Sequence, residues 1–175
     1  MRSRINNNFF TRDVLEVAPA LLGMKLICYD KKGLQQSFTI TETEAYRGEE
    51  DLACHVSKGR TARTEIMYHE GGVLYVYLVY GMHWMLNIVT GRKEVPQAVL
   101  LRGIQGITGP GRLTKALGID KSFNGENMSE SSRIWLEDRV SNPLFITTSR
   151  IGIDYAGPEW KNKQWRFIVK GLPEK

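Results

Sequence analysis

Two glutamates in a predicted strand are the side chains of this sequence best placed for acid–base chemistry. Residues 37–46 are rich in threonine and apolar residues, a pattern typical of a strand. Because strand side chains alternate between faces, we expect five of them on one face: Phe38, Ile40, Glu42, Glu44 and Tyr46. A carboxylate beside apolar and aromatic groups is partly desolvated, which raises its pKa and makes it a better base. The segment therefore predicts a general base, unless the strand leaves the core at its end and both glutamates are solvated.

A second segment is rich in aromatic side chains that could stack on a nucleic-acid base. Tyr75 and Tyr77 are expected on one face of a strand, where they could bind a base or simply pack as strand aromatics. Tyr80 and Met82 flank Gly81, which permits a tight turn. We therefore expect both at the tip of a hairpin, where an exposed side chain can wedge between base pairs.

Two polar residues stand in otherwise apolar strands. Asn87 needs hydrogen-bond partners if it is buried, and could read a base edge or satisfy backbone groups. Arg102 ends the apolar run 99–101, and could bind a phosphate or a carboxylate, or form a structural ion pair.

Two basic segments could contact phosphates. One is the loop 58–64, whose candidates are Arg60, Thr61 and Arg63, although a solvated surface loop has the same composition. The other contains Arg112 and opens a predicted helix, whose N-terminus could bind an anion.

The elements that must position these residues are short and alternate along the chain. A helical segment is predicted at 11–22, with Thr11 as its cap and Pro19 dividing it into two helices. A second helix is expected at 110–117. Strands are predicted at 24–29, 37–46, 73–80, 84–90, 97–103, 134–137, 144–148 and 165–170. This order predicts an α+β fold: one domain over residues 1–175 with a curved, mainly antiparallel sheet, short flanking helices and a protruding hairpin.

Composition narrows the class of protein. The 175 residues carry 24 Lys and Arg against 19 Asp and Glu, a net charge of +5, which suits a polyanionic partner or an ordinary basic protein. The two cysteines form no CxxC pair, and neither a signal segment nor a run of 18 apolar residues is present, so we expect an intracellular protein without a membrane span, cytoplasmic or at the nucleoid in a prokaryote. The histidines, at 55, 69 and 83, have no metal-binding spacing, and we expect neither metal nor cofactor.

Six segments in register resemble the alkyladenine (3-methyladenine) DNA glycosylase family, the type with a single mixed α/β domain rather than the helix-hairpin-helix type. They are Glu42-Thr43-Glu44-Ala45-Tyr46, Ala53-Cys54-His55, Leu74-Tyr75-Val76-Tyr77 with Tyr80-Gly81-Met82 and Asn87, Val99-Leu100-Leu101-Arg102, Gly109-Pro110-Gly111-Arg112-Leu113, and Arg150-Ile151-Gly152-Ile153 with Trp165-Arg166-Phe167. The resemblance runs from about residue 10 to about residue 172. It departs from the family at His83, where an aromatic residue is frequent, and at Arg112, where lysine is common.

The resemblance implies a catalytic group and a base pocket. It makes Glu44 the activator of the attacking water, which Arg102 and the backbone carbonyl of Ile151 also hold. It places the flipped base between the ring of Tyr46 on one side and a second pair of rings on the other, those of His55 and Tyr77.

Two further roles follow from the same resemblance. Tyr80, beside Met82, fills the space that the flipped base leaves in the duplex, and Asn87 rejects normal guanine through a clash with its exocyclic amine.

The resemblance therefore implies a base-excision repair enzyme. Such an enzyme acts on double-stranded DNA that contains damaged purines, hydrolyses the N-glycosylic bond without a lysine Schiff base, and leaves an abasic site. A monomer is the default expectation. The alternatives are a non-enzymatic protein that recognises flipped bases and an RNA-binding module that uses the tyrosine-rich sheet.

Overall fold

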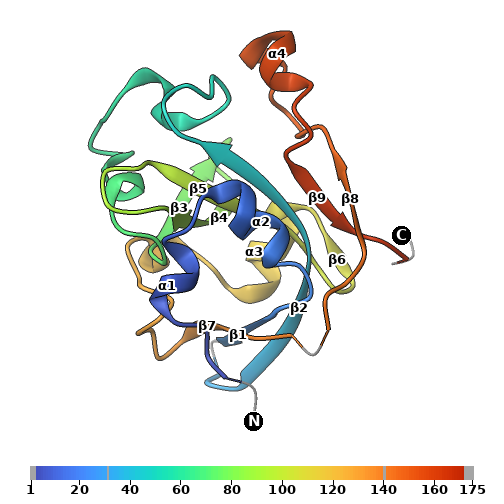
Figure 1. Cartoon of the computed structure of the whole chain (residues 1–175). Coiled ribbons are helices and arrows are strands. Elements are labelled where there is room, and N and C mark those ends of the chain that lie inside the picture. The colour runs from blue at the N-terminus through green and yellow to red at the C-terminus, as the bar shows by residue number, and fades with distance from the viewer. Residues whose placement is uncertain (1–2, 31, 140, 172–175) are drawn as a thin grey trace.

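One long strand, β2 (Gln35–Arg47), organises the fold. The structure is a computed structural model that describes three stretches: residues 3–30, 32–139 and 141–171. The first part of β2 pairs with β1 (Lys25–Tyr29), and its second part pairs with β5 (Gln97–Ile104) and β9 (Arg166–Val169). In Figure 1, β2 runs as a curved ribbon across the whole molecule.

The described strands form a single nine-stranded sheet, and the strand pairs within it are antiparallel. The main order is β3-β4-β5-β2-β1-β7, while β6 pairs with β5 and β8 with β9. The remaining bounds are β3 (Leu74–Val79), β4 (His83–Thr90), β6 (Ile107–Thr108), β7 (Ile134–Glu137) and β8 (Phe145–Thr148). The predicted strands and the α+β class are confirmed, and β6 is an addition.

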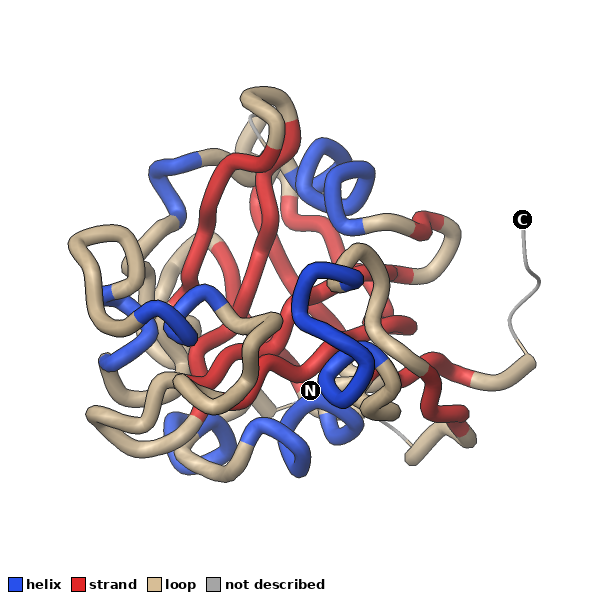
Figure 2. Tube along the Cα trace, turned by 90° about the horizontal axis from the view of Figure 1, so that it is seen from above, coloured by secondary structure: helices blue, strands red, loops and turns tan. Residues whose placement is uncertain are grey.

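Among the residues that the structure describes, four short α-helices, with 3-10 turns and loops, surround the strands, as Figure 2 shows. They are α1 (Asn7–Phe10), α2 (Val14–Ala20), α3 (Pro110–Leu117) and α4 (Gly157–Lys161). Helix α3 begins and ends as predicted, with Gly118 in the left-handed region at its end. Within the described residues, no helix is both long and apolar enough to cross a membrane.

The predicted cap and division of the first helical segment are wrong. Two helices are present, but the chain breaks before Val14, and Pro19 lies within α2. The cap is Asp13, whose carboxylate accepts a hydrogen bond from the N–H of Leu15 at 2.9 Å. The Thr11 hydroxyl instead donates to the carbonyl of Asn8. A carboxylate at the N-terminus also interacts favourably with the helix dipole, which favours Asp13 over Thr11.

The predicted alternation of side chains along β2 is also wrong, because the strand contains an irregularity. Its register against β5 shifts between Ile40 and Glu42 and shifts back between Glu42 and Thr43. A bulge of this kind reverses the faces of all residues beyond it. Ile40 therefore lies in the core with Ala45, and the Thr43 hydroxyl donates to a carbonyl of α2. Glu44 and Tyr46 consequently point away from that core instead of sharing a face with Ile40.

Candidate active site

A cavity lined by aromatic and polar side chains opens beside the second half of β2. It has a volume of about 340 Å³, within the usual range for a small-ligand pocket. Strands β2, β3, β4 and β5 contribute to its walls, together with the loops around residues 53–55 and 151–155. Its lining includes seven predicted site residues: Tyr46, His55, Tyr77, Tyr80, Asn87, Arg102 and Ile151. The fold thus brings together residues that are spread over about a hundred positions of the sequence.

Glu44 lies behind this lining and is fully buried. One carboxylate oxygen accepts a hydrogen bond from the backbone N–H of Ile151 at 2.8 Å, and the other accepts from the Tyr46 hydroxyl at 2.8 Å. The guanidinium Nε of Arg102 is 3.5 Å from the first of these oxygens. Burial raises the pKa of Glu44, and the charge of Arg102 and the two hydrogen bonds offset part of this increase.

Arg102 connects both glutamates of β2. Its Nε donates to Glu42 at 3.1 Å, in addition to its contact with Glu44. The same Glu42 oxygen accepts a hydrogen bond from the Nε of Arg166 in β9 at 2.6 Å. Arg102 therefore forms an ion pair, as one of the sequence alternatives proposed, and its position in the pocket lining also leaves it available to a ligand.

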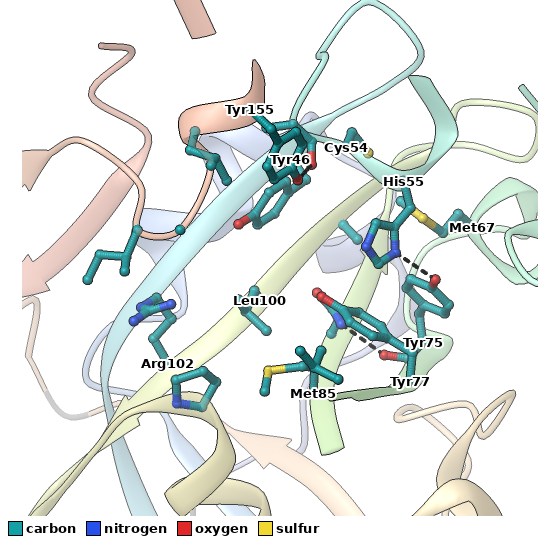
Figure 3. A pocket seen from close by; sticks show the side chains of 18 of the residues that line it. Tyr46, Cys54, His55, Met67, Tyr75, Tyr77, Met85, Leu100, Arg102 and Tyr155 are labelled. Carbon is teal, nitrogen blue, oxygen red and sulfur yellow. Dashed lines mark hydrogen bonds between the residues drawn. The ribbon is translucent and has the colours of Figure 1, made fainter. Parts of the chain in front are cut away.

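Aromatic rings form two facing walls of the pocket (Figure 3). Tyr46 lies on one side, and His55 and Tyr77 lie on the other, with their ring centroids 4.6 Å apart. The Nδ1 of His55 is 2.9 Å from the hydroxyl of Tyr75. Burial, together with the positive charge of Arg63, lowers the pKa of His55 to about 4, so this ring is neutral at neutral pH. Flat rings on opposite sides of a cavity are suited to a planar aromatic ligand.

The hairpin tip next to the pocket is exposed, as predicted. Tyr80 and Met82 are 90% and 68% exposed, and the turn is closed by a hydrogen bond from the N–H of Met82 to the carbonyl of Val79. Tyr80 has a φ of +52°, which is unusual for a residue other than glycine. An exposed ring on a strained turn is a typical feature of a functional contact.

Comparison with known proteins identifies the family. The sequence profile of the methylpurine-DNA glycosylase family matches residues 8–108 and 105–173. The chain belongs to this family. It is thus a DNA glycosylase, and DNA is the molecule on which it acts, in agreement with the resemblance described above.

Three relatives agree with this assignment. A protein of Psychrobacter cryohalolentis is 42% identical, and the alignment covers 98% of this chain and 94% of the relative. A protein of Borreliella afzelii is 44% identical, with 93% and 94% covered, and one of Natranaerobius thermophilus is 36% identical, with 97% of each chain covered. Each carries the name "Putative 3-methyladenine DNA glycosylase".

Asn87 of the glycosylase is 3% exposed and lines the pocket. Its side-chain amide donates a hydrogen bond to the backbone carbonyl of Tyr75 at 3.1 Å. Of the two roles that the sequence left open, the amide thus fulfils one, the pairing of a backbone group. This bond fixes the orientation of the side chain within the pocket wall. The predicted clash with guanine stays a prediction.

The predicted phosphate contacts of the glycosylase differ in their surroundings. Arg60 pairs with Glu65 and Glu94, each at 2.6 Å, and Thr61 lies 3.0 Å from the hydroxyl of Thr64. Arg63 extends over the ring of Tyr77, 5.2 Å from its centroid. Arg112 is exposed at the start of α3. The phosphate-binding roles of these four residues stay predictions.

Three important neighbours of the site, Asp51, Arg150 and Tyr155, have no role predicted from the sequence. Asp51 and Arg150 are fully buried as an ion pair, although they are 99 positions apart. Tyr155, which is 71% exposed, forms part of the pocket rim and donates a hydrogen bond to the carbonyl of Ala53. No group of three or more possible metal ligands occurs within the described parts of the chain.

Proposed function

We propose that this glycosylase excises alkylated and deaminated purines from double-stranded DNA by base flipping and attack of a water molecule. The observation that carries the proposal is the position of Glu44, which is held by Arg102 and Ile151 behind a cavity with aromatic walls. A binding protein needs the aromatic walls alone, whereas a hydrolase also needs a base. The arrangement therefore favours catalysis over simple recognition.

Entry of the base would begin at the hairpin tip. Tyr80 inserts into the duplex and occupies the space that the flipped nucleotide leaves, with Met82 beside it. Flipping costs a few kcal/mol, and less at a damaged pair, so this step contributes to selectivity. The pocket then receives the base between Tyr46 and the rings of His55 and Tyr77.

The pocket suits a cationic alkylated purine. Aromatic faces attract a cation by about 0.5–2 kcal/mol, and the neutral state of His55 avoids repulsion between two positive rings. A cationic base also leaves easily as a neutral molecule. Asn87 limits the range of substrates by a steric clash with the amino group of guanine.

In the chemical step, the water oxygen bonds to C1′ of the sugar as the bond from C1′ to the base nitrogen breaks. The electron pair of that bond leaves with the base, and Glu44 accepts a proton from the water. Glu44 has no exposed surface, so the water must approach it from the pocket that Tyr46, Arg102 and Ile151 line. No lysine is present among the described residues that line the pocket, which favours water over an amine as nucleophile.

The first prediction is release of free base without strand cleavage. Duplex DNA that contains 3-methyladenine or hypoxanthine, neither of which has the 2-amino group of guanine, should yield free base and abasic sites, and strands should break only after alkali treatment. Borohydride should trap no covalent adduct. A trapped adduct would show that an amine attacks the sugar, and tight lesion binding without base release would identify a recognition protein.

The pH dependence provides a second prediction. Burial raises the pKa of Glu44 above its usual value of 4.5, so the ionised base should be lost at a higher pH than for an exposed glutamate. The single-turnover rate on hypoxanthine, a neutral base, should therefore fall on the acidic side above pH 4.5. A rate that stays constant down to pH 4.5 would contradict an ionised Glu44 as base.

A further inference from the structure

A buried ion pair lies directly behind the catalytic strand. Both guanidinium nitrogens Nη1 and Nη2 of Arg150 bind the Asp51 carboxylate, at 2.6 and 2.9 Å, and neither side chain is exposed to solvent. Neither residue is among those that line the pocket. The pair therefore does not touch the base, and any effect on catalysis must act through its neighbours.

Arg150 connects its own segment to the end of β2. Its Nη1 donates a hydrogen bond to the carbonyl of Ala45 at 3.0 Å, which lies between Glu44 and Tyr46 in the chain. Its guanidinium also packs against the ring of Tyr46, 4.8 Å from the centroid, and against Trp165, at 5.0 Å. Planar contacts of this kind fix a guanidinium in one orientation.

Asp51 connects the same arginine to the loop that carries His55. Its carboxylate accepts hydrogen bonds from the N–H of Arg47 at 3.1 Å and from the N–H of Ala53 at 3.0 Å. Three segments of the pocket thus meet at one buried pair: the end of β2, the loop before His55 and the segment that begins at Arg150.

The residue after Arg150 is the one that binds the catalytic base. The N–H of Ile151 donates to Glu44 at 2.8 Å, although the Ile151 side chain is 48% exposed and Gly152 follows it. An exposed segment with a glycine has few contacts of its own to hold this N–H in place. Arg150, which is 4% exposed, is the buried anchor beside it.

We propose that Arg150, held by Asp51, is a positioning residue that keeps the Ile151 N–H on Glu44 and the ring of Tyr46 in place. This inference rests on the proposed function of Glu44. A hydrogen bond to the ionised form of a carboxylic acid favours that form, so displacement of the Ile151 N–H should make Glu44 harder to ionise. The effect should appear in the pH profile, which a purely structural role would leave unchanged.

Several groups around Glu44 must stay constant in the test. The charged and titratable ones are Glu42 and Tyr46 from β2, Tyr77 from β3, Arg102 from β5, Arg166 from β9, and Arg150 and Tyr155 from the segment after β8. Arg150→Lys retains the positive charge but cannot bind Asp51 and Ala45 with a planar fork. A shift of the pH profile in this variant therefore reports geometry and not a change of charge.

The matched control is Arg133→Lys. The Arg133 Nε donates to Glu126 at 2.6 Å, and its guanidinium lies 3.8 Å from the ring centroid of Phe123. Arg133 thus also combines an ion pair with an aromatic contact, but it does not line the pocket. Both variants of the full chain are compared with wild type in single-turnover excision of hypoxanthine from duplex DNA, from about pH 5 to about pH 9.

For Arg150→Lys we expect about a tenfold lower rate near neutral pH and an acid limb about one pH unit higher, the size expected from one lost hydrogen bond to a charged group. Arg133→Lys should retain both the rate and the limb of wild type. An unshifted limb in Arg150→Lys, or an equal shift in Arg133→Lys, would overturn the inference.

If thermal denaturation shows that Arg150→Lys is unfolded, the double variant Arg150→Met with Asp51→Asn, which removes both charges together, decides by the same criterion. Absence of base release by wild type would instead refute the proposed function itself.

Discussion

Replacement of Glu44 by glutamine should lower base excision by about a thousandfold or more, because the water loses its general base. Glutamine has nearly the same shape and can still accept the hydrogen bond from Ile151. Binding to lesion-containing duplex should therefore survive. Single-turnover release of free base and a binding titration with the same duplex would measure the two properties separately.

Stability provides an internal check on this variant. Because burial raises the pKa of Glu44 in the folded state, its ionised form is disfavoured there relative to the unfolded chain. Removal of this charge should not lower the melting temperature at neutral pH. The matched control is Glu42→Gln, which changes the neighbouring glutamate of the same strand and should retain most of the excision rate. A Glu44→Gln variant that excises as fast as Glu42→Gln would assign the base elsewhere.

Replacement of Arg102 by glutamine should lower the excision rate by about a hundredfold, the scale seen when one stabilising donor is removed from an active site. Burial raises the pKa of Glu44, and the charge of Arg102 lowers this pKa more than any other neighbouring group does. The pKa of Glu44 should therefore rise in the variant, which should lose activity on the acidic side at a higher pH than wild type does. Rates measured across the acidic range would show both effects.

Arg166→Gln is the appropriate comparison, because Arg166 binds the same oxygen of Glu42 from the other side. Its charge contributes least among the groups that lower the pKa of Glu44, and its side chain does not line the pocket. Its loss should cost a few-fold in rate at most. Equal losses in the two variants would mean that the Glu42 ion pairs matter for folding and that Arg102 has no separate role at the water.

The parts of the site that the sequence predicts are those with local signals. The exposed tip was predictable because Gly81 interrupts a strand and leaves Tyr80 without a place in the core. The shared face of Tyr75 and Tyr77 follows from simple alternation in a regular strand.

The remaining features depend on partners that are distant in the sequence. The pair of Asp51 and Arg150 joins segments 99 positions apart, and nothing near either residue indicates it. One of the two carboxylates that pair with Arg60 belongs to Glu94, which is 34 positions away in the sequence. The face of Glu44 depends on the pairing of β2 with β5, which periodicity within β2 alone does not contain.

The pairing of β2 with β5 contains two one-residue register shifts in opposite directions, which cancel each other. One extra residue on β2, Thr41, is followed by one extra residue on β5, Arg102, after which the register is restored. Gly103 leaves room for this exchange, since a Cβ there would lie 3.0 Å from both the Thr41 hydroxyl and the Glu42 side chain. Single-residue insertions or deletions in this part of either strand would leave the other shift unmatched. Changes in length are therefore tolerable here only in compensating pairs, one on each strand.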